Sequence, residues 1–255
     1  MKIESIKKMK SGKYKIKLDN NETLVTHDDV LIKNNILTNK VLLEKEYSKL
    51  LKDKEYFDVY NKAVKMIGTK FRSELEIKKY LDKTELEDNK KEEIILKLKN
   101  NGLINDKRFL KAYINDKINL SMDGPRLIFQ NLKEYGIEEN NIIEEIELID
   151  KEVFREKLTK IINKKISNNT KYSKSILRKK VIDYAFSKGY EISFINEIIN
   201  DFDIKDNESI KKDYEKIKNK LSKKYEGNEL KYKIKEKLLI KGYISSDIEK
   251  EICEQ

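Results

Sequence analysis

The sequence predicts a mainly α-helical protein of tandem three-helix repeats, in an elongated curved array with a small strand-containing α+β domain at the N-terminus. Two observations carry this prediction. Gly136, Gly189 and Gly242 lie 53 residues apart, and each follows apolar residues at four-residue spacing. The chain also has one proline, eight glycines and 40% charged residues, which is typical of solvated amphipathic helices. Self-similarity at this period indicates a helical repeat array.

Each recurring glycine is expected to end a helix. An apolar residue at every fourth position marks one helix face, as Ile128 and Leu132 do before Gly136. A glycine four residues later is the usual stop, because it enters the left-handed region without a Cβ penalty. A fourth, degraded copy has Glu85 at the glycine position, so that helix must end in a different way.

Residues 1–54 are expected to form the small α+β domain. Two or three short strands are expected, with a turn at residues 19–22, from the extended segments Lys2–Lys8, Lys13–Leu18 and Glu22–Thr26. Because a lone hairpin is marginal in water, the strands should pack on the helices that follow. We expect these helices over about Asp28–Asn34 and Asn39–Leu51.

From residue 55 onward only helices are expected, in groups of three. We place the four repeats at residues 55–104, 105–149, 150–205 and 206–255. The first helices start near Glu55, Asn105, Asp150 and Asp206, and the last three of these residues are plausible N-caps. The second helices run over Ser73–Lys83, Gly124–Tyr135, Ser173–Lys188 and Asn228–Lys241. The third run over Asp88–Asn100, Glu138–Glu147, Ile192–Asp201 and Ser245–Glu254.

Residues that carry chemistry are scarce in this chain. It has one histidine, His27, and one cysteine, Cys253, too few for a Cys/His nucleophile pair or a zinc site. No glycine-rich phosphate loop occurs, and no pair of carboxylates stands out. We therefore expect no enzyme activity, no cofactor and no metal. No apolar run suggests a signal peptide or a membrane span, so we expect a cytoplasmic protein without a membrane partner.

The formal charge of +10 is unevenly placed. Residues 151–255 hold 26 basic and 18 acidic residues, whereas residues 1–150 hold 30 and 28. A basic C-terminal half indicates an anionic partner, either nucleic acid or an acidic protein surface. The alternative is coding bias, because the basic residues include only five arginines and the chain is rich in Lys, Ile and Asn.

Several short motifs occur in a fixed order. They are Arg72-Ser73-Glu74, then Gly102-Leu103-Ile104-Asn105-Asp106-Lys107-Arg108-Phe109, then Gly124-Pro125-Arg126-Leu127-Ile128 through Leu132 to Gly136-Ile137. In this order and spacing they resemble the RecX family of bacterial regulatory proteins, which bind the RecA recombinase. The resemblance is close over about residues 55–150 and weaker over 150–255. The chain departs from the family pattern at Leu127, where a second basic residue is common, at Glu85, and in having a fourth repeat.

The resemblance implies a negative modulator, a monomer when free, that lies in the helical groove of the RecA–DNA filament. DNA would be contacted directly or through the filament. Such a protein suppresses filament growth, ATP hydrolysis, strand exchange and RecA-stimulated repressor self-cleavage, and so acts in DNA repair, homologous recombination and the SOS response. Two other functions stay open: an autonomous nucleic-acid-binding protein that uses its three-helix units like helix-turn-helix readers, and a helical scaffold for another partner.

Seven basic residues are the candidate contacts with RecA or DNA: Arg72, Arg108, Arg126, Lys174, Arg178, Lys179 and Lys180. An arginine at a helix start opposes the macrodipole and so needs a partner. For Arg72, Arg108 and Arg126 there are two alternatives. The partner is a neighbouring carboxylate of this chain, or it is a group outside the chain, on RecA or a DNA phosphate. The four residues from 174 to 180 form the densest basic cluster, which is either a filament contact or a solvated surface.

Overall fold

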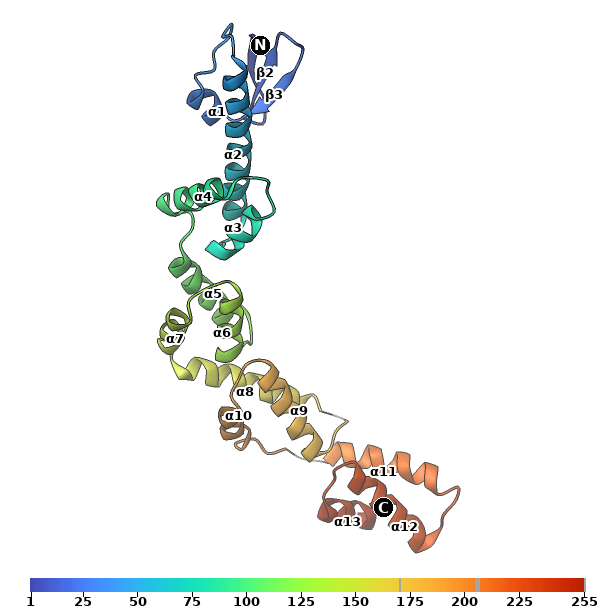
Figure 1. Cartoon of the computed structure of the whole chain (residues 1–255). Coiled ribbons are helices and arrows are strands. Elements are labelled where there is room, and N and C mark those ends of the chain that lie inside the picture. Colours follow the sequence, from blue (N-terminus) through green and yellow to red (C-terminus); the bar gives the residue numbers. More distant parts are fainter. Residues whose placement is uncertain (170, 205–206, 255) are drawn as a thin grey trace. The chain divides into compact units, whose positions relative to one another are not determined.

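A computed structural model of the chain describes residues 1–169, 171–204 and 207–254. A small sheet comes first and helices make up the rest, as the sequence predicted (Figure 1). Internal contacts divide the chain into two compact units, Met1–Leu110 with Tyr135–Ile137, and Lys111–Glu134 with Glu138–Gln255. Asp206, the expected N-cap and first residue of the fourth repeat, lies outside the described residues, as do residue 205 and Gln255.

The first unit begins with an antiparallel sheet in the order β1-β2-β3, formed by β1 (Ile3–Lys8), β2 (Tyr14–Leu18) and β3 (Thr23–Thr26). Ile16 in the central strand lies opposite Ile6 on one side and Leu24 on the other. Both turns use a left-handed residue, Gly12 (φ +83°) in the first and Asn21 (φ +66°) in the second. Two or three strands were expected, and three form; the expected turn at residues 19–22 is confirmed as well.

One long helix, α2 (Glu44–Thr69), follows the short α1 (Asp28–Lys33). It extends the hydrophobic core that begins at the sheet. The sequence predicted two helices here, one ending at Leu51 and one starting near Glu55, and that prediction was wrong. Residues 52–54 are Lys-Asp-Lys, which contain no proline or glycine to stop a helix. The expected boundary between residues 54 and 55 therefore falls inside α2.

Two further helices, α3 (Glu74–Leu81) and α4 (Asp88–Asn100), pack on α2 and on each other. Ser73 caps α3: its Oγ accepts a hydrogen bond from the Glu76 N–H at 3.2 Å, and the Ser73 N–H donates to the Glu76 carboxylate at 3.1 Å. Glu85 keeps a negative φ, and α3 ends in a turn where the Thr84 hydroxyl donates to the Leu81 carbonyl at 2.6 Å. The different stop expected beside Glu85 is confirmed.

Helix α5 (Asp106–Leu120) starts in the first unit and continues into the second. The second unit then contains α6 (Pro125–Glu134), α7 (Glu139–Glu147), α8 (Lys151–Ser167), α9 (Lys174–Ser187), α10 (Ile192–Ile199), α11 (Asn207–Leu221), α12 (Gly227–Ile240) and α13 (Ser245–Glu254). Within it, α8, α9 and α10 pack on one another, and so do α11, α12 and α13. In the described part of the chain, no helix is long and apolar enough to cross a membrane.

The three recurring glycines have the conformation that the sequence predicted. Their φ angles are +78° at Gly136, +88° at Gly189 and +80° at Gly242. The residue after each glycine is buried, and its N–H returns to the helix in two cases: Tyr190 N–H donates to the Ala185 carbonyl, and Tyr243 N–H to the Leu238 carbonyl, both at 3.2 Å. This is the Schellman arrangement that satisfies the last carbonyls of a helix.

The same glycines also allow the end of one helix to touch the start of an earlier one. A Cβ on Gly136 would lie 2.9 Å from the Leu75 side chain, at the start of α3. A Cβ on Gly189 would lie 2.4 Å from the backbone nitrogen of Leu127 in α6, and one on Gly242 would lie 2.6 Å from the Ser175 hydroxyl in α9. The repeated glycine thus has a second role, as the contact point between successive second helices.

Candidate partner-binding surface

Arg126 lies where the start of α6 meets the end of α9. The Gly124 N–H donates to the Lys188 carbonyl at 2.6 Å, and the Arg126 N–H donates to the Gly189 carbonyl at 3.1 Å. The Arg126 guanidinium sits 4.1 Å from the centroid of the Phe186 ring, and its Nη2 donates to the Phe186 carbonyl at 2.7 Å. A cation at the carbonyl end of a helix is favourable. The partner of Arg126 in this structure is therefore a helix C-terminus, not a carboxylate.

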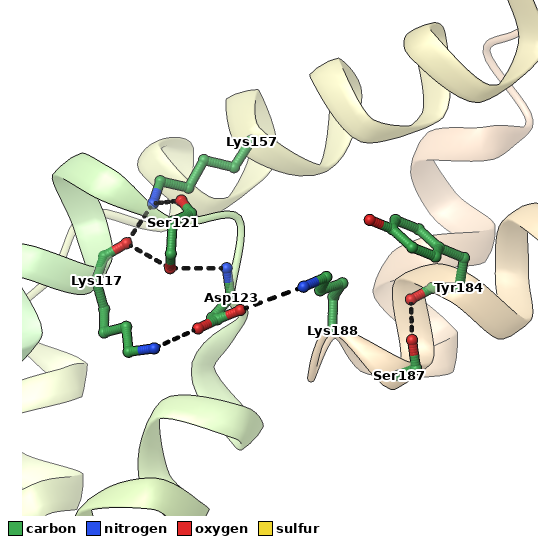
Figure 2. Close-up of polar contacts among 7 residues, drawn as sticks. All are labelled: Lys117, Ser121, Asp123, Lys157, Tyr184, Ser187 and Lys188. Carbon is green, nitrogen blue, oxygen red and sulfur yellow. Dashed lines mark hydrogen bonds and ion pairs between the residues drawn. The ribbon is translucent and has the colours of Figure 1, made fainter. Parts of the chain in front are cut away.

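A partly buried polar network joins the loop before α6 to α8 and α9 (Figure 2). The Asp123 carboxylate accepts a hydrogen bond from the Lys117 ammonium at 2.8 Å and lies 3.7 Å from the Lys188 ammonium. From α8, the Lys157 ammonium donates to the Lys117 carbonyl at 3.0 Å and to the Ser121 carbonyl at 2.9 Å. The ammonium groups of Lys117 and Lys188 beside the Asp123 carboxylate, and that of Lys157 at the end of α5, hold this loop in place.

Burial shifts the acid–base properties of this network. Burial alone would raise the pKa of Asp123, but the hydrogen bond from Lys117 and the charges of Lys117 and Lys188 outweigh it, so that pKa lies below its ordinary value. Burial also lowers the pKa of the Lys157 ammonium, which is 9% exposed. We interpret these charges as structural, since each already has a partner.

Of the candidate residues in the first unit, Arg72 is paired and Arg108 is exposed. The Arg72 Nη1 donates to the Glu76 carboxylate at 2.8 Å, so its partner is the neighbouring carboxylate. Arg108 is exposed in the first turn of α5, capped by Asn105, whose Oδ1 accepts the Arg108 N–H at 2.9 Å. Asp106 does not cap α5; its carboxylate accepts the Glu74 N–H at the start of α3, at 2.8 Å.

The cluster from residue 174 to residue 180 does not form one surface. Lys174 and Lys179 are exposed on α9. The Arg178 Nη2 donates to the Asn200 side-chain oxygen at 2.6 Å, at the end of α10. Lys180 faces α8, and its ammonium lies 4.7 Å from the centroid of the Tyr172 ring. Helical spacing explains this division, because consecutive residues project about 100° apart.

The structure groups Lys180 with lysines that the sequence reading did not select. A hollow of about 620 Å³ lies between the C-terminal half of α8 and the start of α9. We call it the basic hollow and define it by its charged and aromatic lining residues: Lys160, Lys164, Lys165, Lys171, Tyr172, Lys180 and Tyr184. The available signal was the spacing of Lys160, Lys164 and Lys165, which places three ammonium groups on one side of a helix.

A second hollow, of about 590 Å³, lies beside Arg126 and is mainly apolar. Its lining includes Phe129, Ile146, Phe154 and Phe194. No group of three His, Cys, Asp or Glu side chains able to hold a metal ion occurs among the residues that the structure describes. Cys253 is exposed, and His27 lies 3.3 Å from Asp58 at the end of the sheet, far along the chain from either hollow.

Comparison with known proteins gives full-length relatives. The chain is 31% identical over 261 residues to a protein of Listeria monocytogenes serotype 4b named regulatory protein RecX, covering 100% of this chain and 97% of that protein. It is 28% identical over 259 residues to the regulatory protein RecX of Streptococcus agalactiae serotype III, covering 100% and 99%. No family model matches the chain.

Solved structures give the same answer. A crystal structure of regulatory protein RecX aligns with a TM-score of 0.62 and 26% identity, over 78% of this chain and 98% of that one. The crystal structure of RecX from Lactobacillus salivarius aligns with a TM-score of 0.53 and 26% identity, over 58% and 96%. Identity of 31% along the whole length, with a shared helical fold, is decisive. The chain belongs to the RecX family of regulatory proteins.

Proposed function

We propose that this protein is a negative modulator of the RecA recombinase. It binds in the groove of the RecA–DNA filament and inhibits filament growth, ATP hydrolysis, strand exchange and the coprotease activity of RecA. The observation that carries the proposal is the 31% identity over the full chain to a regulatory protein RecX. The protein acts by occupying surface, as a cytoplasmic monomer without a cofactor, and not by catalysis.

The organisation of the chain supports a role in binding an extended partner. We propose four tandem repeats, at residues 55–104, 105–149, 150–205 and 206–255, after an N-terminal domain of residues 1–54. A repeat array presents surface along several successive subunits of a filament. The formal charge of +10 favours association with a filament that carries DNA.

The surroundings of the seven candidate residues support a division of roles among them. Arg72, Arg126 and Arg178 already bind Glu76, Phe186 and Asn200. Arg108, Lys179 and Lys180 are exposed, and the Lys180 ammonium lies over an aromatic ring. Lys174 is exposed as well. We propose that the exposed group contacts RecA or DNA, and that the paired arginines position the helices that carry it.

Binding to preformed filaments tests the proposal. The labelled protein is titrated with filaments of RecA on single-stranded DNA, assembled with a slowly hydrolysed nucleotide, and strand exchange is followed in parallel. We expect saturable binding to filaments, weaker binding to free RecA, and loss of strand exchange. Strand exchange that stays unchanged when the filament is saturated with this protein would refute the inhibitory function.

A further inference from the structure

The basic hollow has a charge composition that sets it apart. Five lysines line it, and no aspartate or glutamate does. Several other lysines of the second unit stand beside carboxylates, as Lys117 does with Asp123 and Lys133 with Glu139. A cleft lined by charges of one sign concentrates the potential and attracts counter-ions of the other sign. The hollow therefore favours an anionic ligand.

The ammonium groups of the basic hollow are available to such a ligand. Lys164, Lys165, Lys171 and Lys180 are exposed, and none forms an ion pair with any residue that the structure describes. Lys160 has one long pair, 3.9 Å to the exposed Glu156. Like charges that share one hollow repel each other, so a bound polyanion would relieve that repulsion.

Two tyrosines stand among these lysines. The Lys165 ammonium lies 3.9 Å from the centroid of the Tyr184 ring, and the Lys180 ammonium lies over Tyr172. The Tyr184 side chain remains 37% exposed. Asn169 fixes the position of Tyr172, because its side-chain amide donates to the Tyr172 carbonyl at 2.7 Å and accepts the Tyr172 N–H at 3.0 Å. The Tyr172 ring is thus held beside Lys180, and the Tyr184 ring lies beside Lys165.

Lysines interleaved with aromatic rings suit a nucleotide chain better than other anions. Proteins that bind single strands combine a basic groove that follows the phosphates with aromatic rings on which bases stack. The hollow's volume, about 620 Å³, lies in the range of roughly 300–1,000 Å³ that small ligands fill, which suits an unpaired nucleotide.

We propose that the basic hollow binds single-stranded nucleic acid directly, with backbone phosphates on Lys164, Lys165 and Lys180 and a base against Tyr184. Lys165 swings from the ring to a phosphate as the base takes its place; its long side chain permits this without moving α8. The site belongs to the free chain, and the inference holds whether or not the protein regulates RecA.

Anisotropy of a labelled oligothymidylate, measured without RecA over a series of salt concentrations, tests the site. The test variant is Lys164→Gln/Lys165→Gln/Lys180→Gln. The control, Lys211→Gln/Lys216→Gln/Lys220→Gln, removes the same charge from three exposed positions of α11. Glutamine has nearly the helix propensity of lysine, so both variants should keep their circular dichroism.

Each lost phosphate contact lowers the log–log salt slope by about 0.7 for a single strand, so we expect the test variant to lower it by about 2 and the control to leave it nearly unchanged. Equal effects of the two variants would mean general attraction by net charge and would overturn the site. Absence of oligothymidylate binding by the unaltered protein would overturn it as well.

A second variant separates stacking from charge. Tyr184→Leu should weaken oligothymidylate binding about tenfold with an unchanged salt slope, because a base loses its aromatic partner and no cation is removed. Competitors then identify the ligand. A single strand should displace the probe, whereas equal displacement by a duplex of the same length, or by ATP alone at similar phosphate concentration, would overturn the assignment to a single strand.

Discussion

Gly189 lies directly against the backbone of Leu127, so that a Cβ on Gly189 would come within 2.4 Å of the Leu127 nitrogen. The end of α9 thereby closes on the start of α6, with hydrogen bonds from the Gly124 and Arg126 N–H groups to the carbonyls of Lys188 and Gly189. The donors at the start of one helix and the acceptors at the end of another satisfy each other. The recurring glycines in the sequence therefore mark packing contacts between helices as well as helix ends.

Substitution of Gly102 and of Gly189 should separate two roles of a left-handed glycine, its backbone conformation and its close contact with a neighbouring helix. Gly102 is left-handed, with φ +66°, but nothing lies within 4 Å of its missing Cβ. Gly102→Ala should cost about 1 kcal/mol in free energy of unfolding, from backbone strain alone. Gly189→Ala should cost about 4 kcal/mol, because α6 must also move away. Urea unfolding of the two variants gives the comparison, and equal costs would show that the close contact has no energetic weight.

The Arg126–Phe186 contact should stabilise the same junction. Removal of the guanidinium in Arg126→Met takes a cation from above the ring and a donor from the carbonyl end of α9. We expect a loss of about 1–2 kcal/mol in free energy of unfolding. A double-mutant cycle with Phe186→Leu should give a coupling of about 0.5–1 kcal/mol. A coupling near zero would mean that ring and guanidinium do not stabilise each other.

Asp123 should make stability depend on acid pH. Because the pKa of Asp123 is lower in the folded chain than its ordinary value of 3.8, its contribution to stability is complete well above that value and is lost as the pH falls through the folded pKa. Asp123→Asn should therefore cost about 2 kcal/mol near neutral pH and progressively less below about pH 4. Asp116→Asn, at an exposed position, is the matched control. A constant cost of Asp123→Asn across this range would contradict the assignment.

The sequence predicted the helices of the repeats well, because their signals are local. Apolar spacing, the Ser73 cap and the left-handed glycines each depend on a few neighbouring residues. It failed at α2, where two expected helices are one, since no proline, glycine or cap marks the middle of that helix. Local signals identify the ends of elements, and their absence is harder to interpret.

The contacts that sequence reasoning missed are those made across long separations. The Asp106 carboxylate, in the first turn of α5, accepts a hydrogen bond from the Glu74 N–H, 32 residues earlier in the sequence. Among the candidate cations, Lys180 was selected from a run of basic residues on α9. The lysines that share its hollow lie mainly on α8, and only the packing of the two helices brings them together.

Exposed candidate cations should affect partner binding without affecting stability. Arg108→Glu and Lys179→Glu replace side chains that are exposed. Each should change the free energy of unfolding by less than about 0.5 kcal/mol. Together they should weaken binding to RecA filaments severalfold, mainly at low salt. Lys107→Glu/Lys216→Glu, at two other exposed positions, has the same charge change and should bind more nearly like the unaltered protein.

The most direct measurement is the rate of ATP hydrolysis by RecA on single-stranded DNA, with and without this protein at well below one molecule per RecA protomer. RecA from the same organism should be used. A negative modulator that acts on the filament should lower the rate at this ratio, because one bound molecule affects many protomers. An unchanged rate, with the chain shown to be folded by circular dichroism, would contradict the proposed function.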